Sequence, residues 1–581
     1  MKKLSLKASC LCGGIQFRTK GHHRNVHNCH CIQCMKTHGH HAAYTAVKEQ
    51  NIKFVKKRTL KWFRSSKKGK RGFCKKCGAS IFFKSIGEKG IHVSAGMFNR
   101  PVKLKTTMHI FVKGKLDYYK LEQYMPKFKS YPKGVPHEIN PEEYDSLVDL
   151  FEVAFEKYGD LPAFENMGKI LSYNEIDQYS ADFASYLQHD LQLKKDDKIA
   201  IMMPNLLQYP IALLGALRAG LIVVNTNPLY TPSEMLHQFN DSNTKAIVIL
   251  ENFANNLQEI LSKTSIEKVI ITKIGDMIGG IKGSIINLVV KHVKRMVPSY
   301  SISGVLRFDK ALEEGAVKPF DRQEIKPTDI AFLQYTGGTT GVSKGAILTH
   351  RNMVANLEQA NAWVGPGNLK ERQEIFITAL PMYHIFALTA NLCLGLRLGS
   401  KNVLITNPRD MSAFLKELMK HKYSLITGVN TLFNKMLNDP RFAKIDHSQS
   451  KVVLAGGMAL QRAVAEKWES ITGNRIAEAY GLTETSPGAC INPLDGNIKI
   501  GSIGLPIPST DVILIDDKGK EVKTGERGEL CVKGPQVMAG YWEKPKETKE
   551  VMMGEYFKTG DIAVMEEDGF FKIVKLLFFE I

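Results

Sequence analysis

The sequence lacks a long apolar run: no stretch reaches the roughly 18 uninterrupted apolar residues that a membrane-spanning helix requires. Its first residues, MKKLSLKASCLCGG, carry the lysines of a signal peptide without the apolar stretch that should follow them. These two absences predict a protein of the cytoplasm. With 581 residues, of which 44% are hydrophobic, the chain can bury several cores and is expected to hold more than one domain.

Acidic residues are scarce in the first fifth of the chain. Residues 1–125 hold 28 lysines and arginines against 4 aspartates and glutamates, so the net charge of +21 belongs to this region. A basic surface attracts phosphates and anionic lipids alike. However, no helix-turn-helix, RNA-recognition or basic-zipper pattern is present, so nucleic-acid binding is not expected and a solvated basic face is favoured.

Cysteine is scarce beyond residue 77 and concentrated before it. Seven of the ten cysteines lie within 10–77, and in a reducing compartment such close-set thiols bind metal more often than they form disulfides. Because structural zinc takes four thiolates and an open zinc site takes three protein ligands, we predict two zinc sites. The closed site would use Cys10, Cys12, Cys74 and Cys77, and the open site would use Cys29, Cys31 and Cys34. A single structural zinc with spare thiols, or another partition of the ligands, stays open.

Several motifs of this region resemble one known family. KASCLCGGIQF, HNCHCIQCMKTHG, RGFCKKCGASIFF, GMFNRP and HIFV, spread over about residues 4–124, are similar to the glutathione-dependent formaldehyde-activating (Gfa-like) family. The resemblance implies a small β-rich zinc domain at 1–124, with a structural zinc on the four cysteines and a labile catalytic zinc on the three. It also implies that a glutathione thiolate could bind the fourth position of the catalytic zinc, and that the domain could act as a carbon–sulfur lyase.

A change of composition marks the next boundary. Residues 125–141 contain four prolines and little periodicity, which predicts a linker. The next domain is expected to begin at residue 142. From Tyr144 apolar residues recur at helical spacing through SLVDLFEVAFEKYG, and helical stretches then alternate with short apolar runs such as KIAIMM, AGLIVVN, KAIVIL and KVIIT. This alternation predicts an α/β domain with largely parallel sheets, which we extend to residue 574.

The most distinctive stretch of this second domain is YTGGTTGVSKGA at 335–346, which is rich in glycine and hydroxyl side chains. It fails the Walker pattern because Lys344 precedes glycine and a strand-like run, AILTH, follows instead of a helix. A flexible loop between two strands can close over the β- and γ-phosphates of ATP while they leave as pyrophosphate. Lys344, Thr336, Thr339, Thr340 and Ser343 would neutralise and bind them. A solvated segment without function is the alternative.

Neighbouring motifs favour the functional interpretation. AEAYGLTETSP places Glu484 where an oxygen ligand could hold magnesium, and YFKTGDIAVMEEDG brings Asp561 into a turn-rich stretch. Together, in this order, the motifs resemble the adenylate-forming acyl-CoA synthetase superfamily. Longer stretches between about 129 and 574, among them MMPNLLQYPIALLGALRAGLIVVNTNPLYTP and GSIGLPIPST, closely resemble bacterial long-chain fatty acid–CoA ligases. The resemblance implies that ATP activates a fatty acid as acyl-adenylate and that coenzyme A then displaces AMP.

The resemblance also assigns roles to single residues. Glu484 would hold magnesium, Asp561 would accept hydrogen bonds from the ribose, and His384, in PMYHIF, would lie near the carboxylate and the acyl tunnel. For His384 an ordinary core histidine is the alternative. Gly456, Gly457 and Tyr480 would line the adenine and acyl pocket. The phosphates would lie against Tyr335, Thr336, Gly337, Gly338, Thr339, Thr340, Gly341, Ser343, Lys344, Gly345 and Ala346. Lys344, His384 and Glu484 would be the catalytic residues.

One segment suits a bilayer surface, where fatty acids partition. IKGSIINLVVKHVKRMVPSY, at 281–300, places the basic residues Lys291, His292, Lys294 and Arg295 beside apolar ones. This pattern is typical of an interfacial helix on anionic lipid, which would make the protein peripheral on the inner face of the cell membrane. An amphipathic helix packed on its own domain fits equally well. The sequence predicts no oligomeric state.

The last residues depart from the family that the second domain resembles. After FKIV, at 571–574, that family continues with a hinge and a small C-terminal domain, whereas this sequence continues with KLLFFEI. We therefore expect the small domain to be absent, 575–581 to be an aberrant apolar tail, and turnover to acyl-CoA to be impaired. Two alternatives remain, a zinc-dependent glutathione-adduct lyase with an inert synthetase remnant and a non-catalytic protein that binds nucleotide or acyl chains.

Overall fold

The computed structural model describes residues 2–86, 90–119, 121, 127–128, 131–132, 134–336, 342–365 and 368–575. Five residues of the predicted phosphate loop, Gly337, Gly338, Thr339, Thr340 and Gly341, lie outside this part of the chain, as does the predicted tail after Lys575. The chain divides into two compact units: Met1–Pro132 with Leu514–Gly528 and Ala563–Phe571, and Lys133–Ile513 with Glu529–Ile562 and Lys572–Ile581. No helix of the described residues is long and apolar enough to cross a bilayer.

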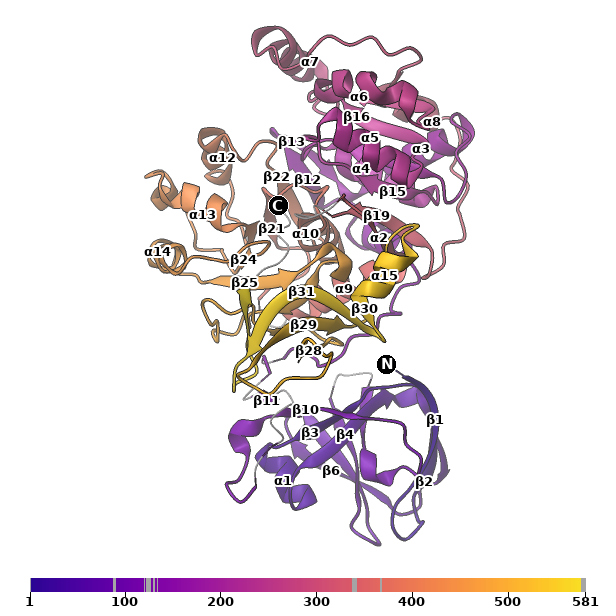
Figure 1. Cartoon of the computed structure of the whole chain (residues 1–581), viewed down its shortest axis with the longest axis vertical. Helices are drawn as coiled ribbons and strands as arrows, with labels where there is room; N and C mark the ends of the chain where they lie inside the picture. Colours follow the sequence, from indigo (N-terminus) through magenta and orange to yellow (C-terminus); the bar gives the residue numbers. More distant parts are fainter. Residues whose placement is uncertain are drawn as a thin grey trace. The chain divides into compact units, whose positions relative to one another are not determined.

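The N-terminal part of the first unit, up to Phe128, is built mainly from strands, as the sequence predicts, and appears in indigo and purple in Figure 1. One sheet has the order β1 (Lys2–Ser9), β2 (Gln16–His23), β5 (Ile52–Lys56). The second sheet has the order β11 (Lys127–Phe128), β10 (Thr106–Ile110), β3 (Val26–Cys29), β4 (Ala42–Lys48), β9 (Gly90–Ser94), β8 (Ser80–Ser85), β7 (Gly69–Cys74), β6 (Leu60–Ser66). A short helix, α1 (Ile32–His38), follows β3.

The two sheets of this unit share one hydrophobic core. Phe17 of β2 and Phe82 of β8 are fully buried with ring centroids 5.0 Å apart, and Cys10 and Cys74 belong to the same cluster. Two residues of the predicted linker, Lys127 and Phe128, form strand β11 beside β10. An extended segment can pair in this way because the edge of a sheet offers unpaired N–H and C=O groups.

The second unit contains a seven-stranded sheet in which only the last strand is antiparallel to its neighbour. The apolar runs identified above form its centre, since each strand is buried on both faces. The order is β18 (Leu306–Arg307), β17 (Lys268–Thr272), β16 (Ala246–Leu250), β14 (Lys198–Met202), β15 (Ile222–Asn225), β19 (Ile330–Tyr335), β20 (Gly345–Thr349). Figure 1 shows the helices around this sheet: α3 (Tyr173–His189), α4 (Gln208–Arg218), α5 (Pro232–Ser242), α6 (Ala254–Ile260), α7 (Gly280–Leu288) and α8 (Phe308–Gly315).

A nine-stranded sheet completes the α/β architecture. Its order is β13 (Lys169–Ser172), β12 (Pro162–Asn166), β22 (Lys401–Leu404), β21 (Ile375–Thr378), β23 (Leu425–Gly428), β24 (Val452–Ala455), β25 (Ile476–Gly481), β26 (Gly488–Ile491), β27 (Leu505–Pro506). The six strands from β12 to β25 are parallel. The helices of this part are α2 (Leu147–Tyr158), α9 (His350–Val364), α10 (Ile385–Ala387), α11 (Leu394–Leu398), α12 (Met411–Leu418), α13 (Asn430–Leu437) and α14 (Arg462–Thr472).

The last strands form a sheet of the order β28 (Asp511–Ile515), β29 (Arg527–Lys533), β31 (Tyr556–Met565), β30 (Met552–Met553), with β32 (Phe571–Lys575) beside β31. Helix α15 (Pro545–Val551) precedes β30. The segment after β29 returns to the seven-stranded sheet, where Ala346 of β20 and Tyr541 form an antiparallel bridge. This return brings a late part of the sequence beside the end of the glycine-rich loop.

Candidate nucleotide site and thiolate clusters

Three of the predicted ligase residues follow the carboxyl ends of parallel strands in the nine-stranded sheet. His384 comes after β21, Gly456 after β24 and Glu484 after β25. Ligands of open parallel sheets bind at this edge, where the connecting loops gather side chains from several strands. Residues far apart in the sequence therefore lie at the same edge of one sheet, which supports a common site.

The described part of the glycine-rich loop is held at both ends. Tyr335 ends β19 and its hydroxyl donates to Asp241 Oδ2 at 2.8 Å, while the Thr336 N–H donates to the carbonyl of Lys344 at 3.1 Å. The carbonyl of Ser343 lies 2.8 Å from Nε2 of His237, which the sequence did not reveal as a loop contact. Gly345 and Ala346 begin β20 and pair with β19. The strand pairing thus fixes where the loop leaves and re-enters the sheet.

Glu484 is a buried carboxylate at this edge of the sheet. It lies in a 3-10 turn at Thr483–Thr485 and is only 6% exposed. Its Oε1 accepts a hydrogen bond from the Tyr541 hydroxyl at 2.6 Å, while its Oε2 is buried without a hydrogen-bond partner. Burial raises the pKa of Glu484, an effect opposed by the Tyr541 hydrogen bond and by the charge of Lys344. A buried carboxylate oxygen without a partner fits a hard cation such as magnesium.

The predicted ribose and pocket residues also meet at this edge. The Tyr480 hydroxyl, at the end of β25, donates to Asp561 Oδ2 at 2.7 Å, and Asp561 on β31 is 1% exposed. A Cβ atom at Gly456 would lie 2.9 Å from a ring carbon of Phe386, so the backbone approaches the ring closely. Gly457 has a φ of 77°, which favours glycine.

His384 precedes this aromatic ring in the chain. Its Nδ1 accepts the N–H of Phe386 at 3.3 Å, and burial lowers the pKa of His384 to about 4. The imidazole is therefore neutral at pH 7. Because Phe386 packs against Gly456, the structure brings the PMYHIF and LAGGM motifs together. The contact is compatible with the predicted pocket, and the alternative of an ordinary core histidine stays open, because burial and a single backbone N–H partner suit it equally.

The seven cysteines of the first unit form two separate groups. The Sγ atoms of Cys10, Cys12, Cys74 and Cys77 lie within 4.8 Å of one another, and so do those of Cys29, Cys31 and Cys34. In the first group the Cys12 sulfur lies 3.6 Å from those of Cys10 and Cys74. Neighbouring sulfurs of a tetrahedral zinc site lie about 3.8 Å apart when the Zn–S distance is about 2.3 Å. The first group therefore fits a closed zinc site.

The three-thiolate group has a cationic neighbour that the sequence did not reveal. Nη2 of Arg71 donates to Cys34 Sγ at 3.5 Å, and Nη1 donates to the Tyr44 hydroxyl at 3.4 Å. The guanidinium lies over the ring of Phe83 and is 4% exposed. Hydrogen bonds from Cys29 and Cys34 lower the pKa of Cys31, and the charge of Arg71 acts in the same direction. A buried cation beside three thiolates balances part of their charge.

Comparison with known proteins decides the family of the second domain. Residues 151–542 match the family model described as AMP-binding enzyme. The chain belongs to the AMP-binding enzyme family. Residues 5–114 match the model described as glutathione-dependent formaldehyde-activating enzyme. Both matches confirm the resemblances drawn from the motifs.

Several curated relatives of this AMP-binding enzyme are long-chain-fatty-acid–CoA ligases. One from Escherichia coli O6:H1 is 53% identical over 444 residues, which are 76% of this chain and 79% of the relative. One from Bacillus subtilis is 35% identical over 456 residues, 78% of this chain and 80% of the relative. A solved long-chain-fatty-acid–CoA ligase from Archaeoglobus fulgidus, 24% identical, aligns with a TM-score of 0.64 over 76% of this chain and 86% of that one. The structural likeness confirms the α/β synthetase fold.

Proposed function

We propose that this AMP-binding enzyme is a long-chain fatty acid–CoA ligase. A fatty acid carboxylate attacks the α-phosphorus of ATP, pyrophosphate leaves, and the thiol of coenzyme A then displaces AMP from the acyl-adenylate. The relatives that are 53% identical support this substrate class. The observation that best supports this proposal is the buried Glu484 carboxylate. Its Oε1 accepts a hydrogen bond from Tyr541, its Oε2 has no hydrogen-bond partner, and the ring of Tyr541 faces the ammonium of Lys344.

Each described residue of the site has a task in this reaction. Lys344 offsets the charge of the departing pyrophosphate, since a fixed cation stabilises charge that develops in the transition state. Glu484 would hold magnesium, which would supply Lewis-acid polarisation of the phosphates. Asp561 accepts hydrogen bonds from the ribose hydroxyls once the Tyr480 hydroxyl yields its place. Neutral His384 and the ring of Phe386 line the entrance for the carboxylate.

Oleate-dependent exchange of labelled pyrophosphate into ATP tests the first half-reaction with the full chain. Removing the charge of Lys344 with Lys344→Ala should slow exchange by about 30- to 1000-fold, the effect of one preorganised electrostatic contact. Lys518→Ala, in an exposed turn, is the matched control. Exchange that does not need oleate, or that survives Lys344→Ala, would refute the proposal.

For the first unit we propose two bound zinc ions and a thiol ligand of the glutathione class at Cys29, Cys31 and Cys34. The support is the separation of the thiolates into a set of four and a set of three. Zinc in a three-thiolate site keeps a position for a further thiolate, which is the requirement for carbon–sulfur chemistry on glutathione adducts. Cobalt-substituted protein tests this proposal. Glutathione should change its thiolate-to-cobalt absorption, and Cys31→Ser should abolish the change; an unchanged spectrum of the unaltered protein would count against it.

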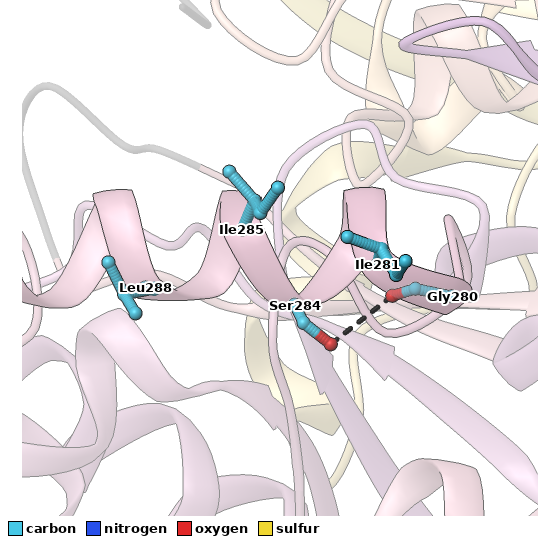
Figure 2. Close-up of a pocket in the computed structure, with 5 residues that line it drawn as sticks. All are labelled: Gly280, Ile281, Ser284, Ile285 and Leu288. Atoms are coloured by element: carbon cyan, nitrogen blue, oxygen red, sulfur yellow. Dashed lines mark hydrogen bonds between the residues drawn. The ribbon is translucent and has the colours of Figure 1, made fainter.

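The surface of α7 favours a peripheral place on an anionic membrane, and with it a cytoplasmic location. Figure 2 shows Ile281, Ile285 and Leu288 along this helix. With Gly280 and Ser284 they line an open surface hollow of about 570 Å³. These three side chains are 81%, 56% and 58% exposed. The helix continues as a π-helical turn, Val289–Val293. This turn contains Lys291 and His292, and Lys294 and Arg295 come directly after it; basic residues beside exposed apolar ones suit anionic lipid.

Co-sedimentation with vesicles tests this surface. Phosphatidylglycerol vesicles should retain the full chain at low salt, whereas phosphatidylcholine vesicles should not. Ile285→Asp should abolish binding, and Val317→Asp, at another exposed apolar position, should leave it unchanged. Equal binding of the Ile285→Asp variant would contradict a role for α7.

A further inference from the structure

Tyr541 occupies a fixed place at the end of the glycine-rich loop. Its neighbours Gly540 and Trp542 are tied to β20: the Ile347 N–H donates to the Gly540 carbonyl at 2.9 Å, and the Trp542 N–H donates to the Gly345 carbonyl at 2.8 Å. The Tyr541 backbone N–H donates to Thr548 Oγ1 at 2.9 Å. These bonds hold the tyrosine in an isolated β-bridge to β20, so its side chain projects from a backbone that is fixed on both sides.

The side chain of Tyr541 lies between two opposite charges. Its hydroxyl donates to Glu484 Oε1 at 2.6 Å, and the centroid of its ring is 5.2 Å from Nζ of Lys344. Tyr541 is 9% exposed, so this environment is largely dry. Lys344 and Glu484 are both described residues, yet they make no ion pair with each other within 4.0 Å. Tyr541 contacts both groups, since its hydroxyl binds the carboxylate and its ring faces the ammonium.

We propose that Tyr541 is a positioning residue that keeps Lys344 and Glu484 apart and aims the carboxylate. This inference rests on the proposed ligase function. The hydroxyl occupies one oxygen of Glu484, which leaves the buried and unpartnered Oε2 as the oxygen available to a cation. The ring face holds the ammonium of Lys344 by cation–π attraction, in reach of phosphate and away from the carboxylate. A direct Lys344–Glu484 pair would neutralise both groups before ATP arrives.

Two variants separate the hydroxyl from the ring. Tyr541→Phe removes only the hydrogen bond to Glu484, and Tyr541→Leu removes the cation–π contact as well. A hydrogen bond to a charged group changes an equilibrium constant by about tenfold or more. Tyr541→Phe should therefore lower the affinity for Mn²⁺ about tenfold, measured in the presence of a non-hydrolysable ATP analogue. Electron paramagnetic resonance measures this affinity without turnover. Pyrophosphate exchange should fall in parallel, and further in Tyr541→Leu.

Tyr423→Phe is the matched control, because that buried hydroxyl also has a side-chain hydrogen-bond partner, Nδ1 of His447 at 2.8 Å. It should leave Mn²⁺ affinity and exchange unchanged. In a Glu484→Gln background, Tyr541→Phe should add less than a twofold effect, since the carboxylate that it orients is gone. Unaltered Mn²⁺ affinity in Tyr541→Phe, or full additivity with Glu484→Gln, would overturn the positioning role. Absence of exchange in the unaltered chain would instead refute the ligase function.

Discussion

The two cysteine clusters should respond differently to the loss of one ligand. The set of four joins the turn after β1 to the turn after β7, and its members Cys12 and Cys74 are 62 residues apart. The set of three spans about five residues around the start of α1. A cross-link that closes a loop removes about (3/2)RT ln n of chain entropy from the unfolded state. This is about 3.7 kcal/mol for the long loop and about 1.4 kcal/mol for the short one.

The closed site therefore stabilises the first unit far more than the open site does. A structural zinc contributes about 10–16 kcal/mol of binding free energy at pH 7, which matches or exceeds the roughly 5–15 kcal/mol stability of a domain. We predict that Cys77→Ser unfolds the first unit, whereas Cys31→Ser keeps the fold and loses only the looser zinc. The core beside the closed site, which includes Cys10 and Cys74, makes the unit's folding depend on that ion.

Zinc content and hydrogen exchange of the full chain measure the two effects separately. Cys31→Ser should retain one zinc per chain and protected amides in β7 and β8, and Cys77→Ser should lose that protection. Cys531→Ser, a buried cysteine of neither cluster, should keep both ions. If Cys77→Ser keeps the protection of β7 and β8, or if both variants lose all zinc together, the assignment of a closed and an open site is wrong.

Three further predictions concern single charges. Glu484→Gln should slow oleate-dependent pyrophosphate exchange by about 30- to 1000-fold, and an unchanged rate would remove Glu484 from the site. Arg71→Gln should weaken the looser zinc at least severalfold in a chelator competition, Arg71→Lys should restore part of the affinity, and equal affinities would deny the charge compensation. Burial lowers the pKa of His350 to about 4. The contribution of the neutral imidazole to the free energy of unfolding is therefore complete above pH 6.5 and is lost as the pH falls from there through 4. Urea unfolding should show a loss of about 2 kcal/mol between pH 7 and pH 5 that His350→Gln abolishes.

The fold of the second domain could be read from its sequence to a large extent. KIAIMM, KAIVIL and KVIIT became the parallel strands β14, β16 and β17, because runs of apolar residues on both faces suit only a sheet covered on both sides. The helical pattern after residue 144 became α2, whose apolar positions are buried except for Val153. Such patterns are local, so they are visible without knowledge of the partners.

The sequence determined which residue types could do chemistry here and their local spacing. It placed Cys29, Cys31 and Cys34 within one turn, and it placed glycines, hydroxyls and Lys344 in one loop, since neighbours in the chain stay neighbours in space. It left open which distant groups would join them. That Cys12 meets Cys74 across 62 residues follows from strand pairing, and only the tertiary structure decided it.

Tertiary structure alone likewise brought Tyr541 to Glu484 and Arg71 to Cys34. These contacts depend on which side chains are buried together and on the bridge between Tyr541 and β20. Spacing along the chain reveals neither of them. A tyrosine in GYW or an arginine in RGF looks ordinary in the sequence. It gains its role because a buried carboxylate or thiolate in a water-poor environment needs a hydrogen-bond donor, and the fold places the tyrosine or the arginine beside it.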